Sequence, residues 1–257
     1  MTTMAPVRVQ SELDAIDVTL FDPATDCARY EMFHAIRLEV FCRSLGWTLP
    51  SDSGRWHDPF DRAARCALAE RGGEPIGILR ALRASTAFPH RELFEAHIER
   101  CGLGEHLDKV GTLNALAVLP AYRRRVYANS CSDARGTAAH LLLRACIDDL
   151  ASDGVCVVMA TVMGLVSARS FLSVGFRLLD LPRSMPGHAR FTVANVGLLV
   201  SKPEGAGVQG LESVGEHFDE CHRHVVGVGP VEELFSSLGR TETESHSLIG
   251  SGDERLA

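Results

Sequence analysis

Strand and helix signals alternate along residues 1–202, and this alternation limits the possible folds more than any other feature of the sequence. Short apolar runs typical of strands are separated by longer segments in which apolar residues recur every three or four positions, as in amphipathic helices. Strands are expected over residues 16–20, 66–70, 76–84, 110–118, 155–161, 176–181 and 190–200, and helices over 26–41, 91–101, 134–152 and 165–173. This order predicts a mixed α/β fold with antiparallel strands early and parallel crossovers after residue 118.

The negative charge is concentrated at the C-terminal end of the chain. Residues 203–257 contain eleven acidic residues and three arginines, a net charge of −8, and the whole chain carries −7, so residues 1–202 carry +1. We therefore predict a domain over 1–202 and an acidic extension over 203–257. Pro230 favours a short helix in this extension that ends at Gly239. Residues 239–257 lack apolar periodicity and are expected to be disordered.

Charge and cysteine usage limit the class of protein. An acidic chain rarely offers the basic face that nucleic-acid phosphates need, so we expect no nucleic-acid partner. Neither a secretory signal nor a run of about 18 apolar residues occurs, so we expect no membrane segment. The cysteines stand singly, without a C-x-x-C pair, which favours reduced thiols in a cytoplasmic protein. They are Cys27, Cys42, Cys66, Cys101, Cys131, Cys146, Cys156 and Cys221.

One run near the C-terminus contains the residue types that bind zinc. It includes His217, Cys221, His222 and His224 among acidic neighbours. In the sequence no second cluster of cysteine and histidine closes a site around this run. We therefore predict no metal ion here and a solvated or partly packed segment.

Three segments in the second half resemble the GNAT N-acyltransferase fold. Residues 116–120 resemble its fourth strand, the Gly136–Ala138 segment resembles the entry into the next helix, and residues 171–176 resemble its helix-to-strand junction. The resemblance implies a mixed central sheet flanked by helices. It also implies an acyl-coenzyme A or acyl-carrier-protein thioester as co-substrate, with no permanently bound cofactor.

GNAT acetyltransferases bind the coenzyme A pyrophosphate with a glycine-containing loop and a helix N-terminus. The resemblance places Gly136 and Ala138 there, although Asp133 replaces the usual basic residue; a plain turn glycine is the alternative for Gly136. Three consecutive arginines follow the fourth strand, and they would contact coenzyme A phosphates or an acidic acyl carrier protein, or lie in a solvated loop. They are Arg123, Arg124 and Arg125.

The first half resembles the acyl-homoserine-lactone synthases and related N-acyl amino acid synthases. Four pieces agree in order and spacing with that family, namely R-x-x-x-F, G-W, D-P-F-D and G-x-x-R. The resemblance implies that these residues form a lid and pocket over an amine substrate, with core aromatics and a structural ion pair as the alternative reading. They are Arg37, Phe41, Trp47, Asp58, Asp61 and Arg80.

Two charged motifs of that family are altered in this chain. The first acid of its E-x-D motif is Trp56 here, and its Glu-x-Ser-Arg strand is Thr112 to Ala115, with Asn114 in place of serine. Asn114 is kept as a substrate-binding candidate. Each buried charge requires an opposite partner. We therefore expect the acceptor amine to differ from the S-adenosylmethionine that lactone synthases use.

Acyl transfer from a thioester needs a neutral amine, a stabiliser for the oxyanion and a route for the proton. In this fold the backbone N–H groups near Leu116 and Val118 would point at the thioester oxygen. Asp58 and Asp61 would take the proton or hold a cationic substrate, and we favour substrate binding. We predict an N-acyltransferase acting on a small-molecule amine; the alternatives are an S-adenosylmethionine-dependent lactone synthase and a noncatalytic binding protein of the same fold.

Overall fold

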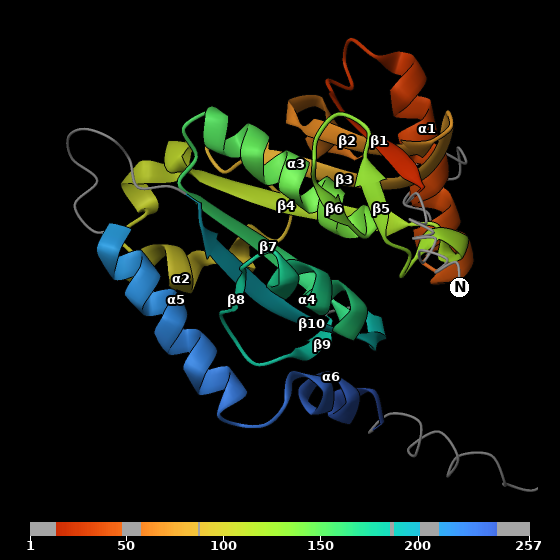
Figure 1. Cartoon of the computed structure of the whole chain (residues 1–257). Coiled ribbons are helices and arrows are strands. Elements are labelled where there is room, and N and C mark those ends of the chain that lie inside the picture. Colours follow the sequence, from red (N-terminus) through yellow and green to blue (C-terminus); the bar gives the residue numbers. More distant parts are fainter. Residues whose placement is uncertain (1–13, 48–57, 87, 186–187, 201–210, 241–257) are drawn as a thin grey trace, which may run out of the picture.

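A computed structural model describes residues 14–47, 58–86, 88–185, 188–200 and 211–240. In this part of the chain ten strands form one sheet in the order β6-β5-β1-β2-β3-β4-β7-β10-β8, with β9 also paired to β10 (Figure 1). The strands are β1 (Ala15–Phe21), β2 (Arg65–Arg71), β3 (Glu74–Arg83), β4 (Val110–Val118), β5 (Tyr127–Asn129), β6 (Arg135–Gly136), β7 (Val157–Met163), β8 (Arg177–Leu178), β9 (Arg183–Met185) and β10 (His188–Leu199). The helices are α1 (Cys27–Arg37), α2 (Glu95–Arg100), α3 (Ala138–Ser152), α4 (Gly164–Ser173), α5 (Leu211–Val226) and α6 (Val231–Arg240), with short turns of helix at η1 (Leu38–Ser44), η2 (Pro59–Ala63), η3 (Arg91–Leu93), η4 (Gly104–Lys109) and η5 (Pro120–Tyr122).

The sheet is mixed, as the sequence predicts. Strands β1 to β4 pair antiparallel in chain order, whereas β4 and β7 are parallel. Parallel neighbours need a crossover connection that returns the chain to the same end of the sheet. The segment that contains α3 makes this crossover, and α3 packs on β2, β3 and β4.

Alternate residues of the strands bury side chains on both faces of the sheet. In β2, Ala67 belongs to one hydrophobic cluster and its neighbour Leu68 to the other, as the two-residue period of a strand requires. Helices α3, α4 and α6 contribute to the first cluster; α1, α2 and the buried Val214 and Phe218 of α5 contribute to the second. The sheet is therefore the middle layer of three (Figure 1).

The helix predicted over residues 134–152 begins four residues later, at Ala138. Residues on either side of the preceding loop form β5 and β6, which pair with each other and extend the sheet beyond β1. Thr137 then caps α3, because its side-chain oxygen accepts a hydrogen bond from the His140 N–H at 3.2 Å. These two short strands form the edge of the sheet.

The C-terminal extension contains α5, a helix that the sequence analysis did not predict. Phe218 of α5 is 2% exposed and lies over Gly197 of β10, where a Cβ atom would come within 2.7 Å of the phenylalanine ring. The predicted short helix is found as α6, directly after Pro230. Residues 241–257, most of the segment expected to be disordered, lie outside the described residues.

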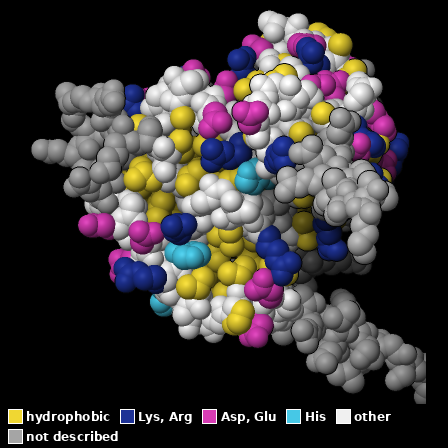
Figure 2. All heavy atoms as spheres, in the orientation of Figure 1, with side chains coloured by type: hydrophobic (Ala, Val, Ile, Leu, Met, Phe, Trp, Pro, Cys, Tyr) yellow, Lys and Arg dark blue, Asp and Glu magenta, His cyan; other side chains and the backbone are white. Residues whose placement is uncertain are grey.

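Charges of both signs share the face of the molecule drawn in Figure 2. Lysine and arginine side chains there are interspersed with aspartate and glutamate, and hydrophobic side chains lie between them. None of the helices in the described part of the chain is both long and apolar enough to cross a bilayer.

Candidate active site

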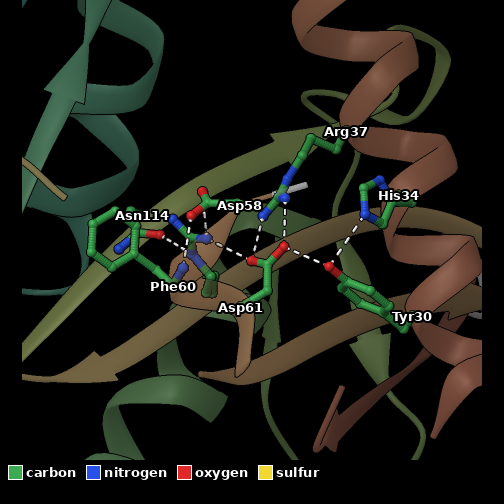
Figure 3. Close-up of polar contacts among 8 residues, drawn as sticks. Tyr30, His34, Arg37, Asp58, Phe60, Asp61 and Asn114 are labelled. Carbon is green, nitrogen blue, oxygen red and sulfur yellow. Dashed lines mark hydrogen bonds and ion pairs between the residues drawn. The ribbon is translucent and has the colours of Figure 1, made fainter. Parts of the chain in front are cut away.

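Asp61 is the centre of a buried charged network (Figure 3). The Arg37 guanidinium donates to both carboxylate oxygens, at 2.9 and 3.0 Å, and Nη1 of Arg80 donates to Oδ1 at 2.5 Å. The Tyr30 hydroxyl donates to Oδ2 at 2.6 Å. The side chains of Arg37, Asp61 and Arg80 are only 2–4% exposed. These three predicted residues therefore meet in the fold, and the contact of Arg37 with Asp61 is the ion pair given above as the alternative reading.

The D-P-F-D segment forms a capped turn that presents both of its aspartates to Arg80. Asp58 caps the short helix η2, because its Oδ1 accepts a hydrogen bond from the Phe60 N–H at 3.0 Å, and Pro59 occupies the first helical position. Oδ2 of Asp58 lies 2.6 Å from Nη1 of Arg80. With 15% of its side chain exposed, Asp58 is more accessible than Asp61.

Asn114 joins the network from the neighbouring strand. It lies directly opposite Arg80 in the β3–β4 register, and its Oδ1 accepts a hydrogen bond from Nε of Arg80. Five of the predicted residues therefore meet at one place, although they come from α1, η2, β3 and β4. They are Arg37, Asp58, Asp61, Arg80 and Asn114.

The electrostatics of the network give its two aspartates different roles. Burial alone would raise the pKa of Asp61, but hydrogen bonds and charge from Arg37, with the charge of Arg80, outweigh burial and lower that pKa. A carboxylate held by two guanidinium groups is a poor acceptor for a further proton. This geometry favours a positioning role for Asp61 and leaves Asp58 as the carboxylate within reach of a ligand.

Two members of the network, Tyr30 and His34, were missed by sequence reasoning. Because the single Tyr30 hydroxyl proton goes to Asp61, the hydroxyl oxygen accepts from Nε2 of His34, at 3.2 Å. Burial and the hydrogen bond to Asp61 raise the pKa of Tyr30. Tyr30, His34 and Arg37 stand at positions i, i+4 and i+7 of α1, and this helical spacing was the available signal.

Strand β4 carries a bulge directly after Asn114. Arg80 pairs with Asn114 and Ile78 with Ala117, so β4 advances three residues where β3 advances two. Ala115 adopts a left-handed conformation with φ of +57°. A left-handed conformation costs a non-glycine residue roughly 1–2 kcal/mol. Such strain is typical of functional sites where the surrounding structure enforces it.

Beyond the bulge, β4 diverges from β7. The two strands pair from Val110 to Leu113, and no pairing continues past Leu113 among the described residues. The Leu119 N–H donates to the Ile76 carbonyl of β3, so by strand alternation the N–H groups of Leu116 and Val118 face away from β3, towards this opening. The stretch of β4 after Leu113 that is not paired with β7 is called the opening here, and it begins next to Asn114 of the charged network.

The basic and glycine candidates lie on the segments that follow β4. Arg123, Arg124 and Arg125 are all exposed on this loop, and Nε of Arg123 donates to the Val118 carbonyl at 2.8 Å, which fixes this arginine beside the opening. Gly136 belongs to β6, and a Cβ there would come within 2.8 Å of the His140 ring. Ala138 is the buried first residue of α3. Close packing therefore accounts for Gly136, and a phosphate-binding role for this segment stays a prediction.

The predicted pocket aromatics stack on each other. The rings of Phe41 and Trp47 lie 4.9 Å apart, at the end of α1, where the helix predicted to run unbroken to residue 41 continues from Leu38 as the π-helix η1. Phe41 is buried and Trp47 is partly exposed. Trp56, one of the two family departures, lies outside the described residues.

Thr112, the other departure, leaves a buried polar atom. Thr112 is 3% exposed, two residues before Asn114 on the same face of β4, and its hydroxyl has no hydrogen-bond partner among the described residues. An unsatisfied buried hydroxyl costs about 1–3 kcal/mol. A polar group of a bound molecule would remove that cost.

A scan against family models and a search of curated proteins find no match to this chain. Solved structures do match. BjaI, a CoA-dependent acyl-homoserine lactone synthase solved with SAM and isopentyl-CoA, is 15% identical with a TM-score of 0.54, covering 79% of this chain and 90% of BjaI. The AHL synthase LasI is 13% identical with a TM-score of 0.52, covering 72% of this chain and 90% of LasI. TofI, solved in a ternary complex with an inhibitor and MTA, is 18% identical with a TM-score of 0.50, covering 77% of this chain and 96% of TofI. The chain therefore has the GNAT fold predicted from its motifs, in the form found in the acyl-homoserine-lactone synthases.

Proposed function

We propose that this protein is an N-acyltransferase that moves an acyl group from a coenzyme A or acyl-carrier-protein thioester to the amine of a small molecule. The observation that carries the proposal is the bulged, diverging end of β4 beside the Asp61 network. It combines two requirements of acyl transfer at one place, namely backbone donors for an oxyanion and a carboxylate for an amine.

The backbone of β4 would stabilise the tetrahedral intermediate. The N–H groups of Leu116 and Val118 face the opening, and the left-handed Ala115 holds this stretch of strand away from β7. In comparable sites each oxyanion donor is worth about 2.7–4 kcal/mol. Because the donors belong to the main chain, the side chains at these two positions contribute little to this step.

Asp58 would receive the acceptor amine. Its carboxylate is the more exposed of the two aspartates, and the contact with Arg80 fixes its orientation. It would accept a hydrogen bond from the amine as the nitrogen attacks the thioester carbonyl. Asp61 would keep Arg37 and Arg80 in place, and Phe41 with Trp47 would form an apolar wall.

The thioester donor would enter from the α3 side of the opening. Arg123 is held at the end of β4 by its bond to the Val118 carbonyl, and the capped N-terminus of α3 follows the β5–β6 pair. A guanidinium and a helix N-terminus both favour phosphate groups. The same groups would suit the phosphate of coenzyme A or of a carrier-protein arm, and Arg124 and Arg125 would face an acidic carrier surface.

A lactone synthase acting on S-adenosylmethionine is the second candidate. It is favoured by the likeness to BjaI, a protein solved with SAM, and by the presence of all four motif pieces of the first half. Trp56 and Ala115 stand against it, as does Thr112, because the family uses charged residues at these three positions. The acceptor that we expect is therefore a different amine, with a polar group that pairs with Thr112.

The test is a screen of purified full-length protein against acetyl- to dodecanoyl-coenzyme A and matching acyl carrier proteins. Each donor is combined with amino acids, simple amines or S-adenosylmethionine, and products are identified by mass. An N-acyl amide supports the proposal. Lactone formation with release of methylthioadenosine supports the second candidate. Thioester binding without any product in the whole screen would overturn both and favour a noncatalytic binding protein.

A further inference from the structure

Three zinc-binding side chains meet where α2 and α5 lie side by side, away from the residues used above (Figure 1). Nδ1 of His97 lies 3.2 Å from Nε2 of His217, and Sγ of Cys221 lies 3.5 Å from the same Nε2. All three ligand atoms lie within 4.8 Å of one another. The sequence shows no second cluster beside the His217 run, but the fold brings His97 to it from 120 residues away.

Two of the three separations, those that involve Nε2 of His217, match the edges of a tetrahedral zinc site. With Zn–N bonds of about 2.05 Å and Zn–S bonds of about 2.3 Å, tetrahedral angles place two nitrogens about 3.3 Å apart and a nitrogen and a sulfur about 3.6 Å apart. Only small movements of the rings and the thiol would therefore admit an ion. His97 is 8% exposed, and His217 and Cys221 are partly exposed, so the ion would be shielded but reachable.

The surroundings of His97 resemble those of a metal ligand. Its second nitrogen, Nε2, lies 4.0 Å from Oδ2 of Asp180. The Asp180 carboxylate is held by the Asn195 N–H at 2.9 Å and its side-chain amide at 2.7 Å. This separation is longer than a hydrogen bond; a carboxylate that accepted the Nε2 proton would fix the ring and make the facing nitrogen a better donor to a metal. Such a carboxylate is a common companion of histidine ligands.

Cys101 lies near the three side chains and is the candidate for a fourth donor, although its sulfur is not among the atoms that meet within 4.8 Å. The two helices carry the same H-x-x-x-C spacing, His97 with Cys101 and His217 with Cys221, and one helical turn brings each pair to one side. Cys101 is 5% exposed and shares a hydrophobic cluster with Cys221.

We propose that His97, His217 and Cys221, with Cys101 as the fourth ligand, bind one zinc ion that joins the C-terminal helix α5 to α2. Two nitrogens and two thiolates are a common ligand set of closed structural zinc sites. Binding would release the two thiol protons, and the ion would stabilise the docked position of α5 over the sheet. The proposal does not depend on acyl transfer.

The test measures metal in the full-length chain after removal of any affinity tag. We expect about one zinc per chain by mass spectrometry of the metal. Replacement by Co²⁺ should give visible bands of a tetrahedral centre and near-ultraviolet bands of two thiolate ligands. A chelator should lower the thermal midpoint, and added zinc should restore it.

Variants separate ligands from neighbours. His217→Gln and Cys221→Ser should each lower zinc affinity by more than about tenfold, and Cys101→Ser should remove one thiolate band from the Co²⁺ spectrum. His224→Gln on the exposed side of α5 and Cys131→Ser, an exposed thiol elsewhere, are matched controls that should bind zinc as the unmodified chain does. Circular dichroism of each variant confirms that it is folded.

Three results would overturn the proposal. The first is a folded chain that neither contains zinc nor binds Zn²⁺ or Co²⁺ at micromolar concentration. The second is a Cys101–Cys221 disulfide in the protein purified under reducing conditions. The third is equal zinc affinity in Cys221→Ser and Cys131→Ser. None of these results bears on acyl transfer, so this proposal and the proposed function can fail separately.

Discussion

At the scale of single residues, the network around Asp61 balances its own charges. Arg37 and Arg80 face Asp58 and Asp61, so two positive and two negative charges are buried or nearly buried together. A buried ion pair adds little net stability relative to an apolar pair of the same size, but removal of one partner leaves an unpaired charge. We therefore expect that Asp58 can bind different partners without destabilising the fold, whereas substitution of Asp61 destabilises it.

Asp61→Asn should lower the free energy of unfolding at pH 7 by about 3–5 kcal/mol, because Arg37 and Arg80 lose their shared carboxylate. The pKa of Asp61 is lowered in the folded state, so its contribution is complete above the unfolded pKa of about 3.9 and is lost as the pH falls through the lower folded pKa. The free energies of unfolding of the unmodified protein and the variant, measured in urea, should converge as the pH is lowered from neutral to below about 4. A difference that stays constant over this range would contradict the assignment.

Asp58→Asn should preserve the fold and impair the reaction. The loss of one charged hydrogen bond to the amine corresponds to about 1.5–3 kcal/mol, or roughly 10- to 100-fold in kcat/KM. Steady-state kinetics with a saturating thioester measure the effect, and the thermal midpoint serves as the check on folding. Asp108→Asn, at an exposed aspartate beside Lys109, is the matched control. Equal kcat/KM in both variants would remove Asp58 from the site.

The sequence predicted the charged half of the network and missed its aromatic half. Arg37, Asp58, Asp61 and Arg80 stood in family-like motifs, whereas Tyr30 and His34 belong to no motif and only share a helical face with Arg37. The contact of His97 with His217 could not be predicted in this way, because it depends on how two distant helices cross. Apolar periodicity indicates which face of a helix a residue occupies, but it does not indicate which other element packs against that face.

At the scale of elements, the bulge in β4 is the feature that connects the fold to the proposed chemistry. Ala115 holds a left-handed conformation that glycine adopts without cost. The strand bounds were predicted correctly over residues 110–118. The apolar pattern of the sequence could not predict the bulge, because the bulge depends on the pairing register of β4 with β3.

Ala115→Gly should retain acyl transfer and change stability by no more than about 1 kcal/mol, because relief of strain offsets the greater freedom of the unfolded chain. Ala115→Val should lose stability and activity together, since a β-branched residue is strongly disfavoured at positive φ. Thermal unfolding and the thiol-release rate of the two variants make the comparison. Full activity in a stable Ala115→Val variant would show that the bulge is not required.

Strands β5 and β6 and helix α5 are among the elements that were missed, for different reasons. Strands β5 and β6 contain three and two residues and exist through pairing with β1 and with each other, so no local signal announces them. In α5 the signal was present, because Val214, Phe218, Cys221 and Val225 recur at helical spacing. Because residues 203–257 are strongly acidic, they were interpreted as an extension of the domain, and the helix was not predicted.

At the scale of the whole molecule, the C-terminal extension completes one face of the sheet. Val214 and Phe218 of α5 are almost fully buried, and Arg169 of α4 pairs with Glu232 of α6 at 2.8 Å on the other side. The predicted boundary near residue 202 separates two charge compositions. The described part of the extension nevertheless packs into the same core as residues 1–202.

Gly197→Ala should therefore destabilise the whole chain by about 1–3 kcal/mol, because the new methyl group would meet the Phe218 ring at 2.7 Å. Combination with Phe218→Leu should cost less than the sum of the two single changes. Gly215→Ala, inside α5 with ordinary contacts, is the control and should be neutral or slightly stabilising. Additive losses in chemical unfolding would mean that α5 does not dock on β10 in this way.

The most direct test of the account is amine-dependent release of free thiol from an acyl thioester by the full-length chain. Thiol is followed for each donor with and without the acceptor mixture, with Asp58→Asn measured beside it. We predict that release requires the amine, matches the amide formed one for one, and falls roughly 10- to 100-fold in the variant. Thioester binding with no amine-dependent release from any donor would contradict the central claim that the opening beside β4 is an acyl-transfer site.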